Sequence, residues 1–232
     1  MKKRNAALLL VLGILLLPVV AIANQIELLY PDQYSLVQFT YPNTGNSYSN
    51  IVAGSITGQI DGQIGTNSHV SGNTTNFFCI DLDHTFSFGP VYNYEYFDLT
   101  GNRANAAKLV KAFASSLPDA EHGAGLQAAV WSVIYPGQFN LVTGGNIATY
   151  MQQYLDQLNS GLPAAPEYRG LDLFTVDASG QRIADYQDLI GVPDPIHAPE
   201  PGTFLLLSCG LLGLLATSRR RWLLSLSGPK IK

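Results

Sequence analysis

The stretch VYNYEYFDLTGNRANAAKLVKAFASS, residues 91–116, contains the change of hydrophobic period on which the fold depends. From 91 to 99 aromatic residues occupy alternate positions, which places their rings on one face of an extended strand. From 105 to 116 apolar residues recur at intervals of three and four, the spacing of one face of an α-helix. Pro118 then ends the helical pattern. The chain therefore changes from strands to helices near residue 100.

The segments on either side extend this division. Alternating apolar and polar residues, broken by Gly and Asn, predict strands before residue 100 at 25–41, 50–65 and 76–82. Later segments are predicted as helices at 123–134 and 146–158 and as strands at 168–176 and 181–190. We expect one exported α+β domain at 24–193, with a mostly antiparallel, barrel-like sheet in its N-terminal half and inserted helices.

The first 23 residues have the composition of a secretory signal peptide. Lys2, Lys3 and Arg4 precede an apolar run, and Ala21-Ile22-Ala23 supplies the small residues of a cleavage site. We therefore predict that segment 1–23 directs export and that signal peptidase cleaves after Ala23. The alternative is an uncleaved N-terminal membrane helix.

The C-terminal region divides into three segments of different chemistry. Prolines favour an extended linker at 194–201. The 17 uncharged residues at 202–218 predict a short transmembrane helix; at about 1.5 Å per residue it would be roughly 25 Å long. A basic segment at 219–232 is expected to stay in the cytoplasm. The sequence thus predicts a domain anchored in the inner membrane and facing its exported side.

Three ordered features of this region resemble the PEP-CTERM sorting signal. They are the tripeptide Pro199-Glu200-Pro201, the short apolar helix and the triplet Arg219-Arg220-Arg221. The resemblance implies that a membrane-bound exosortase recognises the tripeptide and processes the tail, in bacteria that build extracellular polysaccharide. The protein would then reach the cell surface or the extracellular space. An ordinary tail anchor is the alternative.

Charge and motifs exclude several functions for the part between the two ends. Residues 24–201 carry 5 basic and 17 acidic residues, a net charge of −12, so nucleic acid is not an expected partner. An acidic surface favours amine-bearing partners. Phosphate-binding loops, nucleophile elbows and zinc-protease motifs are missing from the sequence, so we expect neither an enzyme nor a cofactor. Asp81, Asp83 and His84 are too few ligands for a predicted metal site.

One cysteine and one glutamine stand out in apolar surroundings. Cys79 is the only cysteine outside the predicted membrane helix, so an intrachain disulfide is excluded and the thiol needs another explanation. Gln127 places an amide within the apolar helical run Leu126–Trp131, after a flexible approach at Gly123-Ala124-Gly125. A buried amide requires hydrogen-bond partners.

These two motifs, Phe77-Phe78-Cys79 and Gln127-Ala128-Ala129-Val130-Trp131, together resemble the thioester domains of bacterial surface proteins. The resemblance implies that the Cys79 sulfur displaces ammonia from the Gln127 amide, and that an amine of a surface ligand later attacks the thioester. The product would be a covalent tether. Trp131 is a supporting residue, and His84 and His122 are equal contenders for the base.

Another interpretation stays open at this point. Cys79 can be a small buried hydrophobic residue, with Gln127 packed in a core helix and no thioester formed. The protein would then be a non-covalent polysaccharide-binding or structural matrix protein. In that case the rings of Tyr92, Tyr94 and Tyr96 would be available to stack on sugars.

Overall fold

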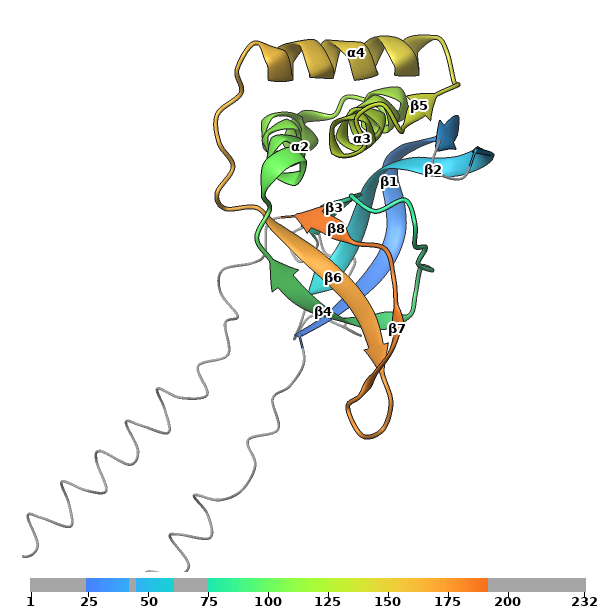
Figure 1. The fold of residues 1–232 in the computed structure, drawn as a ribbon, viewed down its shortest axis with the longest axis vertical. Coiled ribbons are helices and arrows are strands. Elements are labelled where there is room, and N and C mark those ends of the chain that lie inside the picture. Colours follow the sequence, from blue (N-terminus) through green and yellow to red (C-terminus); the bar gives the residue numbers. More distant parts are fainter. Residues whose placement is uncertain (1–23, 42–44, 61–74, 192–232) are drawn as a thin grey trace, which may run out of the picture. The chain divides into compact units, whose positions relative to one another are not determined.

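The computed structural model describes residues 24–41, 45–60 and 75–191 (Figure 1). Within these ranges the chain forms an eight-stranded antiparallel sheet and three α-helices, which confirms the predicted α+β class. Outside the described residues lie the predicted signal peptide, the predicted linker with its proposed sorting tripeptide, the predicted transmembrane helix and the basic tail. The described part contains no helix long and apolar enough to cross a membrane.

The elements follow the predicted order. The strands are β1 (Asn24–Tyr41), β2 (Asn46–Ile60), β3 (Thr75–Cys79), β4 (Val91–Phe97), β5 (Asn140–Leu141), β6 (Arg169–Val176), β7 (Arg182–Asp185) and β8 (Leu189–Gly191). The helices are α2 (Gly101–Phe113), α3 (Ala120–Ile134) and α4 (Asn146–Asn159), and a 3₁₀ turn at Ala114–Ser116 follows α2.

Two predictions of strand content were wrong. The strand predicted at 181–190 is divided, because β7 pairs only with β6 as a hairpin whereas β8 pairs with both β6 and β3. The two-residue strand β5 was missed, since so short a segment shows no hydrophobic period; it is a strand because it pairs with β1.

Six of the strands close into a ring in the order β1-β2-β3-β8-β6-β4, with β4 pairing back to β1. Ile26 of β1 accordingly lies opposite Ile60 of β2 on one side and Tyr92 of β4 on the other. Inward-pointing side chains fill the interior of such a small ring. Buried side chains in this core include Ile26, Leu28, Phe77, Tyr92, Tyr94, Leu171 and Leu173.

Strand β3 lies between two cores, because alternate side chains of a strand point to opposite faces. Phe77 and Cys79 belong to the core inside the ring of strands. Phe78 and Ile80, just beyond the strand, belong to a second core shared with the helices. Figure 1 shows the three helices gathered at one end of the sheet.

Helix α3 begins earlier than predicted because Asp119 caps it, its carboxylate accepting the His122 backbone N–H at 2.9 Å. The segment Gly123-Ala124-Gly125, predicted as a flexible approach, lies inside this helix. Its glycines serve close packing: a Cβ on Gly123 would lie 1.7 Å from the carbonyl oxygen of Gln33 in β1. Small residues thus allow α3 to contact the sheet directly.

Candidate functional site

The buried amide of Gln127 lies against the main chain of Cys79. Its Nε2 donates to the Cys79 carbonyl oxygen at 2.8 Å, and its Oε1 accepts the Cys79 backbone N–H at 3.0 Å. The pairing of β2 with β3 ends at Phe77. Two residues further on, the Gln127 amide makes the two main-chain hydrogen bonds to Cys79 that a neighbouring strand would otherwise make. The structure therefore brings together the two residues of the predicted thioester.

The thiol of Cys79 is in an apolar environment. The residue is 7% exposed and packs in the core inside the ring of strands. Burial raises the pKa of the Cys79 thiol well above its usual range, and the negative charge of Asp81 acts in the same direction. At neutral pH the group is therefore an uncharged thiol, protected from ionisation.

Cys79 borders a cavity of about 250 Å³ between β1, β2, α3 and the loop that follows β3. The wall is mostly apolar, with rings from Phe39, Tyr48, Phe86 and Phe88. Apolar walls of this kind keep reactive groups away from bulk water. The cavity thus places open space next to Cys79.

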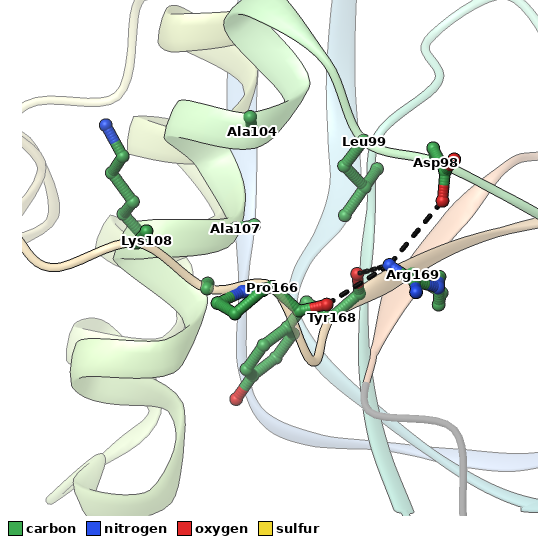
Figure 2. A pocket seen from close by; sticks show the side chains of 10 residues that line it. Asp98, Leu99, Ala104, Ala107, Lys108, Pro166, Tyr168 and Arg169 are labelled. Atoms are coloured by element: carbon green, nitrogen blue, oxygen red, sulfur yellow. Dashed lines mark hydrogen bonds and ion pairs between the residues drawn. The ribbon is translucent and has the colours of Figure 1, made fainter.

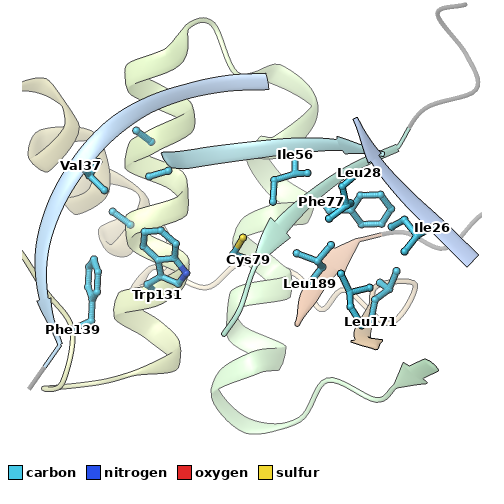
Figure 3. Close-up of a cluster of buried hydrophobic side chains, with 14 of the residues drawn as sticks. Ile26, Leu28, Val37, Ile56, Phe77, Cys79, Trp131, Phe139, Leu171 and Leu189 are labelled. Atoms are coloured by element: carbon cyan, nitrogen blue, oxygen red, sulfur yellow. The ribbon is translucent and has the colours of Figure 1, made fainter. Parts of the chain in front are cut away.

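Trp131 also lines this cavity, one helical turn after Gln127. Its side chain packs against Phe39 and Phe139, with ring centroids 5.5 and 5.7 Å away. The edge that bears its nitrogen faces Cys79 in Figure 3. Among the described residues, the Trp131 Nε1 is the one buried side-chain nitrogen or oxygen without a hydrogen-bond partner.

His84 reaches the same cavity because the chain turns directly after β3. The carboxylate of Asp81 forms the turn: one oxygen accepts the Asp83 backbone N–H at 2.8 Å and the other pairs with His84 Nδ1 at 2.6 Å. The hydrogen bond to Asp81, together with its charge, raises the pKa of His84. An imidazole held at Nδ1 by a carboxylate is the usual arrangement of an oriented acid–base group.

His122, the other contender, lies elsewhere. Its Nδ1 pairs with Asp119 at 2.8 Å in the first turn of α3, and its ring stacks on Tyr150 at 3.6 Å between centroids. It is not among the residues that line the Cys79 cavity. Of the two histidines proposed from the sequence, the structure places only His84 beside the site.

Two residues that the sequence reasoning missed hold the loop after β3. Tyr135 hydroxyl accepts the Leu82 backbone N–H at 3.1 Å and donates to the Ile80 carbonyl at 3.4 Å. Burial raises the pKa of Tyr135 to about 12, so the hydroxyl keeps its proton. Gln187 Nε2 donates to the Asp81 carbonyl oxygen. Tyr135 was detectable, since it follows Gln127 by about two helical turns; the distant Gln187 gave no signal.

The tyrosines considered for sugar binding are mostly inside the sheet. Tyr92 and Tyr94 are 2% and 1% exposed, and the Tyr92 hydroxyl is occupied by the main chain of Ser87. Their rings cannot stack on a ligand in this conformation, whereas Tyr96 is exposed. In the described ranges, no group of three His, Cys, Asp or Glu side chains is placed to hold a metal ion.

A second, more open pocket of about 350 Å³ lies where α2 meets the segment before β6 (Figure 2). Its charged lining residues are already engaged. Arg169 pairs with Asp98 at 3.5 Å and donates to the Pro166 carbonyl at 3.1 Å, while Lys108 donates to Asn105 at 2.9 Å. This pocket contains none of the residues proposed from the sequence.

Comparisons of the chain with protein-family models, curated proteins and solved structures found no match.

Proposed function

We propose that this chain is an exported surface or extracellular-matrix protein, delivered through the membrane and processed by exosortase at its PEP-CTERM tail. Its domain forms an internal thioester between Cys79 and Gln127 and attaches covalently to an amine-bearing ligand. The observation that carries the thioester is the buried Gln127 amide, held on Cys79 by hydrogen bonds of 2.8 and 3.0 Å.

The first chemical step would form the thioester. The Cys79 sulfur attacks the side-chain carbonyl carbon of Gln127, a carbon–sulfur bond forms, and the carbon–nitrogen bond breaks. The thiol proton leaves with the nitrogen, so the by-product is ammonia. The apolar cavity then shields the thioester from hydrolysis.

The second step would attach the ligand. A primary amine attacks the same carbon, the carbon–sulfur bond breaks, and a secondary amide joins the ligand to Gln127. One amine proton must reach the departing sulfur, and His84, oriented by Asp81, lies in the cavity where it can carry that proton. Each molecule reacts once, so the protein acts as an adhesive and does not turn over substrate.

A non-covalent matrix protein is the second candidate function, and two features of the same pair of residues are compatible with it. The Gln127 amide already has both of its polar atoms paired with the Cys79 main chain, which links α3 to β3 without any covalent bond. The raised pKa of the Cys79 thiol also keeps the reactive thiolate scarce. Exposed residues, including Tyr96, would then supply the binding surface.

Intact mass of the full chain, purified in detergent, separates the two functions. Loss of ammonia lowers the mass by about 17 Da relative to the sequence of the purified form, and denatured Cys79 then resists alkylation. Methylamine should restore a thiol that alkylates. The Cys79→Ala variant, which cannot form the bond, provides the control at full mass. A wild-type chain of full mass whose Cys79 alkylates without methylamine would contradict the adhesin and favour the matrix protein.

Sorting is tested separately from the thioester. Replacing Pro199, Glu200 and Pro201 together by alanine should leave an unprocessed chain in the inner-membrane fraction. Asp194→Ala, in the same linker but outside the tripeptide, is the matched control and should be processed normally. Equal processing of both variants would argue against exosortase as the partner.

A further inference from the structure

The indole nitrogen of Trp131 needs an explanation because buried hydrogen-bond donors are almost always paired. The side chain is 1% exposed, so bulk water does not satisfy it from outside the fold. It lines the cavity that also contains Cys79, and its nitrogen edge faces that residue in Figure 3. The donor is thus directed at the place where the proposed chemistry occurs.

The helix fixes the relation between Trp131 and Gln127. Residues four apart on an α-helix lie on the same face, one turn above the other. Both side chains are buried on the side of α3 that meets the ring of strands. The Gln127 amide and the Trp131 indole therefore lie on the same face of α3, one turn apart, and both face the segment that contains Cys79.

One donor to that carbonyl is already present. The backbone N–H of Cys79 donates to Gln127 Oε1 at 3.0 Å. Acyl transfer passes through a tetrahedral intermediate whose oxygen carries negative charge, and a pair of N–H donors is the common means of stabilising it. Tyr135 hydroxyl is occupied by the loop main chain, so it does not supply the second donor.

We infer that Trp131 Nε1–H is the second donor of an oxyanion site whose first donor is the Cys79 backbone N–H. This inference rests on the proposed thioester. When sulfur or amine adds to the Gln127 carbonyl carbon, the electron pair of the C=O bond moves to Oε1, and both N–H groups stabilise that oxygen. When the intermediate collapses, the pair returns and either ammonia or the Cys79 thiolate leaves. No atom is exchanged with Trp131.

The test measures methylamine attachment to the full chain in detergent, by intact mass against time. Trp131→Phe keeps an aromatic ring and removes the donor, so the rate at saturating methylamine should fall by roughly 10²- to 10³-fold with the half-saturating concentration unchanged. Phe139→Leu is the matched control, because it disturbs the ring that packs on Trp131 and leaves the donor in place. Its rate should stay within about tenfold of wild type.

The proton resonance of the Trp131 indole N–H tests the inference in the wild-type chain, in case Trp131→Phe does not fold. In the wild-type chain, the Trp131 indole N–H proton resonance should shift when methylamine opens the thioester, while Trp222, the second of the two tryptophans, stays constant. An unchanged resonance, or a Trp131→Phe variant that reacts at the wild-type rate, overturns this inference alone. A wild-type chain without the loss of ammonia overturns the proposed thioester and this inference together.

Discussion

Helix α3 has two buried sides, and they differ in chemistry. One side contributes the apolar residues Leu126, Ala129 and Val130 to the core shared with α2 and α4. The side that faces the sheet carries the Gln127 amide and the Trp131 indole nitrogen. Both sides exclude water to the same degree, so burial alone does not explain why polar atoms gather on one of them.

This difference separates the side of α3 that only stabilises the fold from the side that carries the proposed chemistry. A helix that is apolar on all sides is sufficient to fill a core. Polar groups buried in such a helix lower stability unless every atom finds a partner. Departures from the simplest packing are expected at functional sites. The sheet-facing side of α3 is such a departure, and the following changes test it in order of expected size.

The largest effect is expected from Gly123→Ala, which alters the close approach of α3 to the sheet. A methyl group there would lie 1.7 Å from the Gln33 carbonyl oxygen, so the helix must move away from β1. We expect a loss of roughly 4 kcal/mol or more in the free energy of unfolding. Denaturant titration measures it. Gly144→Ala, where the methyl group would meet nothing within 4 Å, should change stability by less than about 0.5 kcal/mol.

A smaller effect distinguishes the two sides of α3 directly. In a Cys79→Ala background, where no thioester can form, Gln127→Met leaves the N–H and C=O of residue 79 without their partner. The expected loss is roughly 2–4 kcal/mol. Leu126→Met, the neighbouring position on the apolar side, should cost less than about 1.5 kcal/mol. Equal losses in urea titrations would mean that the Gln127 amide stabilises the fold only by filling space, and not through its hydrogen bonds.

The smallest effect concerns how the stability of the fold depends on pH through His84, which lines the Cys79 cavity. Because Asp81 raises the pKa of His84 in the folded state, the pair stabilises the fold below the unfolded value of about 6.5. That contribution is lost as pH rises through the folded pKa of His84. His84→Gln should therefore lower the melting temperature more at pH 6 than at pH 9. Half of the His84 side chain is exposed, so the difference will be modest; a pH-independent difference would exclude the pairing.

The sequence predicted elements with strong periods better than it predicted pairings. The strand predicted at 91–99 and the helix predicted at 123–134 are present as β4 and α3, because their apolar residues repeat every second or every third and fourth position. The division between β7 and β8 was not, because β8 depends on pairing with β3, a strand far away in the chain. The barrel-like sheet was expected in the N-terminal half, whereas the ring also needs β6 and β8, and local periodicity does not show which distant strands pair.

The candidate site was predicted only in part, because some of its features also depend on contacts between distant segments. Cys79 and Gln127 were recognisable as polar or reactive groups in apolar runs, and the structure brings them into contact. The choice between His84 and His122 was not decidable from spacing, because it depends on the turn that Asp81 forms after the strand. The unpaired nitrogen of Trp131 could not be predicted, because whether a buried donor has a partner depends on tertiary contacts.

Strand β8 determines when this domain can finish folding during synthesis. Its three residues are the last described ones, yet Leu189 completes the core inside the ring and Ile190 completes the core beneath the helices. A ribosome makes the chain from its N-terminus, so a nascent chain that stops before residue 189 has an open ring and two unfinished cores. Native structure must therefore await synthesis through residue 191, and contacts between such distant segments form slowly. That delay would suit the proposed export, in which the chain crosses a membrane before it becomes compact.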